Sequence, residues 1–91
     1  MVKRALVFLI EGAEDMETVI VVDMLRRAEI NVTLAGVKGD EAVLCNQNVR
    51  IIPDIALSSV ANDTFDAVII PGGGKGAEGC GNVTKKHLNF I

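Results

Sequence analysis

The first forty residues alternate between apolar runs and a segment with helical periodicity. Residues 3–10 form a β-rich apolar run that predicts a buried strand. Residues 14–28 begin with acids and end with Arg26 and Arg27, which suits the dipole of a helix. The apolar positions of this segment have helical spacing: Met16, Val19, Ile20, Met24 and Leu25. Residues 30–36 alternate and end in glycine, so they predict a second strand and complete a βαβ unit with a right-handed crossover.

The middle of the chain predicts a small hairpin. Residues 42–46 and 49–53 are short β-prone runs around an Asn-Gln-Asn turn, and Pro53 closes the second run as an edge. Residues 56–62 have room for one turn of helix.

The last third predicts one more core strand and a glycine-rich loop. Residues 65–70 are apolar, and PGGGKG follows them at once. Residues 82–90 predict a short helix with Asn82 as its cap. The pattern as a whole predicts an α/β protein with a flavodoxin-like parallel sheet.

Composition agrees with one small domain and narrows the function classes. The chain has 91 residues, and its apolar mass is Val, Ile, Leu and Ala, as in a parallel sheet covered by helices. A net charge of −3 and the lack of a basic stripe argue against nucleic acid as a partner. The sequence has no run of about 20 apolar residues for a membrane, and the N-terminal apolar run stops at Glu11 without a cleavage site, so we expect a cytoplasmic protein.

The cysteines and the histidine do not predict a metal or cofactor site. Cys45 and Cys80 lie far apart, without CxxC spacing, and are expected to be free thiols. His87 is the one histidine, and no cluster of His, Cys and carboxylates has ligand spacing. We therefore expect no metal and no cofactor.

The glycine loop is a candidate for binding an anion or oxyanion. Ligands of open α/β sheets bind at the carboxyl ends of the strands, where Glu11–Glu14 and Pro71–Gly74 should meet. Glycines allow backbone N–H groups to approach such a ligand closely. The loop lacks the P-loop pattern, and its loose GxGxxG does not lie in the first βα turn. A surface loop whose glycines only make turns is the open alternative.

Glu17 is the candidate acid or base. It lies one turn into the predicted helix, beside the same crevice, where desolvation would raise the pKa of its carboxyl. The alternative is a surface glutamate favoured by the helix dipole.

Four stretches resemble a known family: KRALVFLIEGAEDMETV, DMLRRAEINVTLAG, AVLCNQNVRIIPD and FDAVIIPGGGKGA. They are similar to the N-terminal half of the Parkinson disease protein 7 deglycase family, the DJ-one branch of the PfpI/ThiJ superfamily. The resemblance implies a flavodoxin-like fold of the class I glutamine amidotransferase type, with residues 1–91 as the N-terminal portion of a single domain. It also implies an oxidative-stress-response protein with deglycase or glyoxalase chemistry on methylglyoxal and glycated adducts, whose members are cytoplasmic and also nuclear and mitochondrial.

The resemblance assigns roles to particular residues. Glu17 matches a glutamate that supports the reactive cysteine, and Gly72 and Gly73 match backbone oxyanion donors beside it. Cys45 matches a second, less reactive cysteine near a dimer interface and is the redox candidate. The first helix, with Met16, and the 42–53 hairpin match dimer contacts, so we expect a homodimer or a heterodimer with a full-length relative.

Several positions depart from the family pattern. The resemblance places the family's nucleophilic cysteine after a later strand, and the sequence ends at Ile91, so we expect these 91 residues to lack the nucleophile. We expect this chain to be inactive alone, with Cys80 no substitute and His87 no base; the alternative function is a non-catalytic dimerisation module. A flavin or nucleotide binder is a third reading that rests on the loop alone. Glu29 stands where the family usually has a glycine with a positive φ at the end of the helix, and it should cost about 1 kcal/mol if that conformation persists. Ile52 replaces a cysteine of some relatives. An exposed edge on the third core strand predicts a marginal or associating chain.

Overall fold

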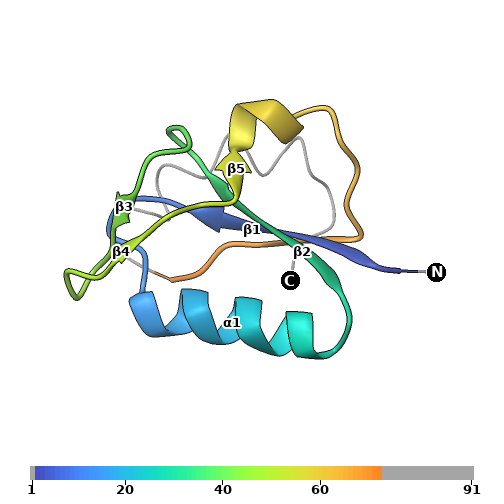
Figure 1. Cartoon of the computed structure of the whole chain (residues 1–91), viewed down its shortest axis with the longest axis horizontal. Coiled ribbons are helices and arrows are strands. Elements are labelled where there is room, and N and C mark those ends of the chain that lie inside the picture. The colour runs from blue at the N-terminus through green and yellow to red at the C-terminus, as the bar shows by residue number, and fades with distance from the viewer. Residues whose placement is uncertain (1, 73–91) are drawn as a thin grey trace.

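The structure is a computed structural model that describes residues 2–72 (Figure 1). Its main sheet has four parallel strands in the order β5-β2-β1-β6. They are β1 (Arg4–Leu9), β2 (Asn31–Gly36), β5 (Ile55–Ala56) and β6 (Ala67–Ile69). Helix α1 (Asp15–Arg27) lies along one face of this sheet, and the 3-10 turn η1 (Leu57–Val60) lies on the other.

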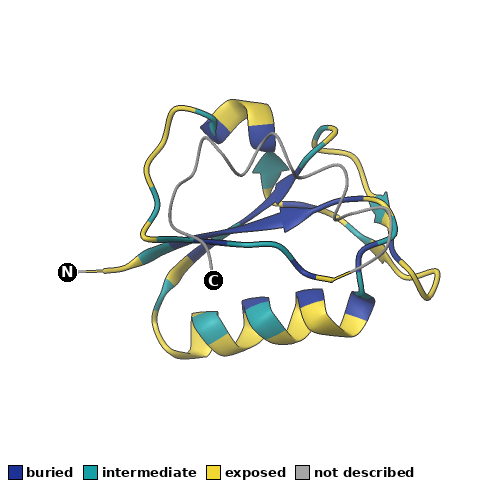
Figure 2. Cartoon of the chain, turned by 180° about the vertical axis from the view of Figure 1, so that it is seen from behind, coloured by how far each residue is buried: buried dark blue, intermediate teal, exposed yellow. Residues whose placement is uncertain are grey.

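Strand β1 is the centre of the core because it is buried on both faces. Val7 and Leu9 pack on the α1 side with Val22, whereas Leu6 and Phe8 pack on the η1 side. This arrangement explains why residues 3–10 read as a continuous apolar run instead of an alternating one. Figure 2 shows the same contrast between the buried strands and the largely exposed outer surface of α1.

The predicted hairpin is present and short. Strands β3 (Val43–Leu44) and β4 (Arg50–Ile51) pair antiparallel as a separate two-stranded sheet. Asn48 turns the chain with a φ of 65°, a left-handed conformation that asparagine tolerates better than most residues.

Strand β5 is an element that the sequence pattern missed. It begins two residues after Pro53 and pairs with β2 over two residues, Ala35 and Gly36. Two residues are too few for a periodic signal, so the prediction of Pro53 as a closing edge overlooked the strand behind it. The strand predicted over residues 65–70 is confirmed, although its paired part is shorter, at Ala67–Ile69.

The helix is confirmed, but four of the five apolar residues whose spacing predicted it do not pack on the sheet. Asp15, Thr18 and Val22 are its buried residues, and Leu25 is partly buried. Four apolar side chains point to solvent instead: Met16, Val19, Ile20 and Met24. An apolar stripe of α1 is therefore left uncovered within the described chain.

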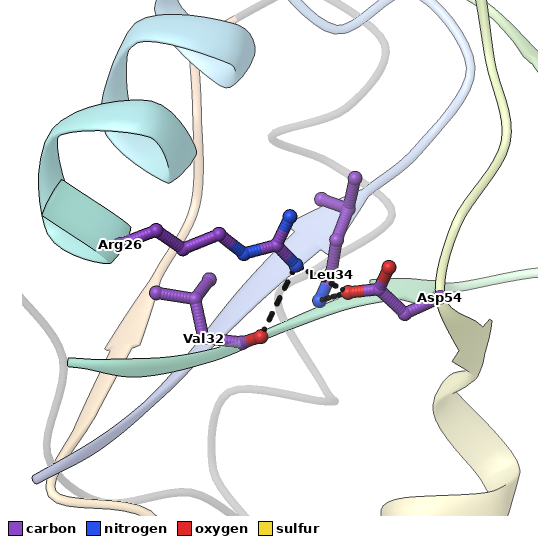
Figure 3. A network of polar contacts seen from close by, with 4 residues as sticks. All are labelled: Arg26, Val32, Leu34 and Asp54. Atoms are coloured by element: carbon purple, nitrogen blue, oxygen red, sulfur yellow. Dashed lines mark hydrogen bonds and ion pairs between the residues drawn. The ribbon is translucent and has the colours of Figure 1, made fainter. Parts of the chain in front are cut away.

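The C-terminal end of α1 is tied to β2 and to the start of β5 by a polar network (Figure 3). Asp54 Oδ2 accepts hydrogen bonds from Arg26 Nη2 at 2.8 Å and from the backbone N–H of Leu34 at 2.9 Å. Arg26 also donates to the carbonyl of Val32 at 3.3 Å. The network therefore fixes where the chain after the hairpin rejoins the sheet.

Glu29 takes the left-handed conformation expected at the end of the helix. Its φ is 64°, and its N–H donates to the carbonyl of Arg26 at 3.0 Å. The positive φ persists without glycine, which is the condition under which we expect a cost at this position.

Within residues 2–72, no helix is long and apolar enough to cross a membrane. The helix predicted over residues 82–90 lies outside the described residues.

Candidate functional site

The strand order places the candidate site between β1 and β6. From β1 the chain passes through α1 to β2 and on to β5, and β6 then pairs on the opposite side of β1. In sheets of this kind the reversal leaves a crevice at the carboxyl ends of the two strands where ligands bind. The loop before α1 and residues 71–72 lie at that point, as the sequence predicted.

Backbone and side-chain contacts bring these two loops together at Gly72. The N–H of Glu14 donates to the Gly72 carbonyl at 2.8 Å, and the Gly72 N–H donates to Glu17 Oε1 at 3.3 Å. A Cβ on Gly72 would lie 3.1 Å from Glu17 Oε2, which is closer than side-chain atoms normally approach. The predicted meeting of Glu17 with the Gly72 amide is thus present, and glycine permits the close approach.

The predicted burial of Glu17 is wrong. Glu17 is exposed, although its carboxylate reaches the Gly72 amide. The inward positions of the first helical turn belong to Asp15 and Thr18, so residue 17 faces away from the sheet. The catalytic role of Glu17 remains a prediction, and Gly73 lies outside the described residues, as do Cys80 and His87.

A second carboxylate, which the sequence did not single out, is more deeply embedded. Asp15 is 9% exposed, and its two oxygens accept from the backbone N–H groups of Gln47 at 2.8 Å and Val49 at 3.2 Å. Asp15, which is not part of the hairpin, therefore stabilises the hairpin turn by accepting hydrogen bonds from two of its backbone N–H groups. A first-turn acid reads as a response to the helix dipole, and nothing in the local sequence links residue 15 to residue 47.

Cys45 lies in the same turn and is a free, buried thiol. It is 4% exposed, and its Sγ lies 3.8 Å from the carbonyl of Val43. Burial, and then the nearby charge of Asp15, raise the pKa of the Cys45 thiol above its ordinary value. Because the thiolate is the reactive form, this environment makes Cys45 a poor nucleophile.

These features define a class of protein: a parallel α/β fold with a helix carboxylate and a glycine amide at the reversal of its strand order. The chain belongs to the DJ-1/PfpI family, whose sequence profile matches residues 3–88. The family resemblance and the flavodoxin-like fold are therefore confirmed.

Individual relatives agree with this assignment. Protein dj-1beta of Drosophila melanogaster is 53% identical over 81 residues, which is 89% of this chain and 43% of the relative. Its crystal structure superposes with a TM-score of 0.84, at 54% identity, over 86% of this chain and 42% of that one. The Parkinson disease protein 7 homolog of Danio rerio is 52% identical, over 84% of this chain and 41% of the relative.

A third relative carries an activity in its name. The chain is 46% identical to the glutathione-independent glyoxalase DJR-1.2 of Caenorhabditis elegans, over 78% of this chain and 38% of that protein. The chain thus spans about two fifths of the length of the curated relatives that it matches.

Proposed function

We propose that this chain contributes one wall of a glyoxalase-type site that acts on small aldehydes such as methylglyoxal, with deglycation of glycated adducts as a related activity. The observation that carries the proposal is the contact between the Glu17 carboxylate and the Gly72 amide at the reversal point of the sheet. The sequence identity to a glutathione-independent glyoxalase supports the reaction class.

The two groups suit the chemistry of an α-oxoaldehyde. Conversion of methylglyoxal and water to lactate is redox-neutral and moves protons between carbon and oxygen. A solvent-accessible carboxylate can accept and return such protons. A backbone N–H beside it can stabilise an oxyanion as negative charge develops on the substrate carbonyl.

The described residues do not supply the thiol that cysteine-dependent chemistry would need. Cys45 is the cysteine within residues 2–72, and its burial and raised pKa disfavour the thiolate. We propose that the site needs a thiol from outside residues 2–72, and that the 91-residue chain by itself does not turn over methylglyoxal.

The test is the loss of methylglyoxal in the presence of the purified 91-residue chain, the double variant Cys45→Ser/Cys80→Ser and the variant Glu17→Gln. All three should match the rate in buffer. Turnover by the unaltered chain that persists in the double variant would show that neither thiol is needed and would contradict the proposal. Turnover by the unaltered chain that is lost in the double variant would assign the nucleophile to one of these two thiols and overturn the predicted inactivity.

We also propose that the chain is an association module that pairs with a second copy or with a full-length relative. The exposed apolar stripe of α1 favours this function. Met16 is 71% exposed and Met24 is 64% exposed, and Ile52 beside the hairpin is 73% exposed. Next to the stripe, a largely apolar groove of about 340 Å³ runs between α1 and β4, with Val19, Val22 and Ile51 in its lining. Contiguous apolar surface of this kind is typical of protein interfaces.

Self-association would bury this surface in an isologous interface, in which the same patch serves both copies. Sedimentation equilibrium of the unaltered chain should show a dimer at micromolar concentration. Met24→Glu should weaken the dimer at least about tenfold, because it places a charge in an apolar contact. Ser58→Glu is the matched control, since Ser58 is exposed on η1 at the opposite face of the sheet.

A monomer at these concentrations, together with no co-purification with full-length dj-1beta, would rule out the association module. Equal weakening by Met24→Glu and Ser58→Glu would also contradict it, because the effect would then follow charge and not position.

A further inference from the structure

Five hydrogen bonds join residues 12–15, which lie just before and at the start of α1, to residues 44–49 of the hairpin. Two are backbone bonds: the Gly12 N–H donates to the Leu44 carbonyl at 3.0 Å, and the Asn46 N–H donates to the Ala13 carbonyl at 2.9 Å. The other three use the side chains of Glu14 and Asp15. Glu14 Oε1 accepts from Asn46 Nδ2 at 3.0 Å, and Asp15 accepts from the Gln47 and Val49 amides.

Two residues in or near this segment, Glu14 and Glu17, form hydrogen bonds with Gly72. The Glu14 N–H donates a hydrogen bond to the Gly72 carbonyl, and the Glu17 carboxylate accepts one from the Gly72 N–H. Asp15 stands between these two residues in sequence. A displacement of Asp15 therefore moves the two residues that hold Gly72.

The deepest of these contacts is the one at Asp15. Glu14 is half-buried and Glu17 is exposed, whereas Asp15 is buried and offers its charge to two backbone amides. Within residues 2–72, no basic side chain forms an ion pair with Asp15. Hydrogen bonds to a charged group are about twice as strong as neutral ones, so this carboxylate is the firmest point of attachment between hairpin and helix.

We infer that Asp15 is a positioning residue that holds the Glu17–Gly72 contact in register with the hairpin turn at residues 45–49. Leu44 and Val49, at the two ends of that turn, are exposed. Occupation of the hairpin surface by a second copy is thereby linked to the geometry of the Glu17–Gly72 contact. The functional meaning of this link rests on the proposed function, whereas the structural link does not.

The test uses nuclear magnetic resonance of the 15N-labelled 91-residue chain. The first measurement is amide hydrogen exchange at Gln47 and Val49. The second is the pH dependence of the Gly72 amide proton shift, which should show a step as the hydrogen-bonded Glu17 carboxylate is protonated. Glu17→Gln calibrates this step, because it removes the titrating group and should abolish it.

Asp15→Asn is the test variant, and Asp23→Asn is its matched control. Asp23 is an exposed acid on the same helix that pairs with Arg27 at 2.9 Å. Asp15→Asn should raise exchange at Gln47 and Val49 roughly tenfold and reduce the Gly72 step at least about twofold. Asp23→Asn should change neither measurement.

Faster exchange at Gln47 and Val49 with an unaltered Gly72 step would overturn the inference, because Asp15 would then cap only its own turn. A Gly72 shift with no step in the unaltered chain would also overturn it. If Asp15→Asn does not fold, Asn46→Ala decides, since it removes only the side-chain bond to Glu14. It should reduce the Gly72 step in the same direction, and an unchanged step would contradict the inference.

These measurements need neither turnover nor association. A chain that does not associate but shows the coupled loss at Gly72 would contradict the proposed association module and support the inference. A chain that dimerises but shows no coupling would do the reverse.

Discussion

The two ends of α1 are each anchored by an aspartate, and the two anchors differ in how their charge is balanced. At the N-terminal end, Asp15 is 9% exposed and is satisfied by two backbone amides. At the C-terminal end, the Asp54 side chain is 45% exposed and shares its charge between the Leu34 amide and Arg26 (Figure 3).

The difference shows that backbone donors, more than opposite charge, decide where a carboxylate can be buried in this fold. An exposed ion pair contributes little because water competes for both partners. A buried carboxylate that two amides satisfy is costly to remove, since the amides then lose their partner away from water. The N-terminal anchor should therefore contribute more to the free energy of unfolding than the C-terminal one, and four experiments test this difference.

Asp15→Ala should have the largest effect. It leaves the Gln47 and Val49 amides without their acceptor and should lower the free energy of unfolding by about 3 kcal/mol. Urea unfolding followed by circular dichroism measures the loss, and Asp23→Ala is the control with an expected change below about 0.5 kcal/mol. Equal losses for the two variants would end the distinction between a buried and an exposed acid on α1.

Asp54→Ala should cost less, about 1–2 kcal/mol, because one backbone amide and one arginine lose a half-exposed partner. Arg26→Ala separates the two contributions in the same urea experiment. It should cost less than Asp54→Ala, since the Leu34 amide keeps its acceptor. A larger loss for Arg26→Ala would show that the ion pair, and not the backbone bond, anchors this end.

Glu29→Gly should stabilise the chain by up to about 1 kcal/mol. The φ of Glu29 is 64°, a conformation that glycine adopts without the steric cost of a Cβ. Thermal unfolding measures the gain, and Glu29→Ala is the control that keeps the Cβ. A similar gain in both variants would mean that loss of the charge, and not relief of the backbone, is responsible.

The pH dependence contributed by Cys45 should be the smallest effect and reports on the N-terminal anchor. Because the folded thiol has a raised pKa, its contribution to stability is complete below the pKa of the unfolded thiol. That contribution is lost as the pH rises toward the folded value. In a Cys80→Ser background, stability should fall between about pH 8 and 10 more than in the matching Cys45→Ala variant. Identical slopes would show that the surroundings of Cys45 do not favour the neutral thiol.

The βαβ unit that positions the candidate site could be predicted from local sequence patterns. The unbroken apolar run of β1, the charged ends of α1 and the glycine at the end of β2 predict the βαβ unit, because each is a local property of a short stretch. The Asn-rich turn predicted the hairpin. The meeting of Glu17 with Gly72 followed from where the strands end and from the family resemblance.

The face of α1 that packs on the sheet is set by tertiary contacts. These contacts bury Asp15 and leave Glu17 and the apolar stripe exposed. Periodicity gives the spacing of a helical face but not its direction, which depends on the sheet and hairpin that the helix packs against. The bonds from Asp15 to Gln47 and Val49, and the pairing of β5 with β2, join residues 20 or more positions apart. No local pattern encodes such contacts, because they come into existence only when the folded chain brings their donors and acceptors together.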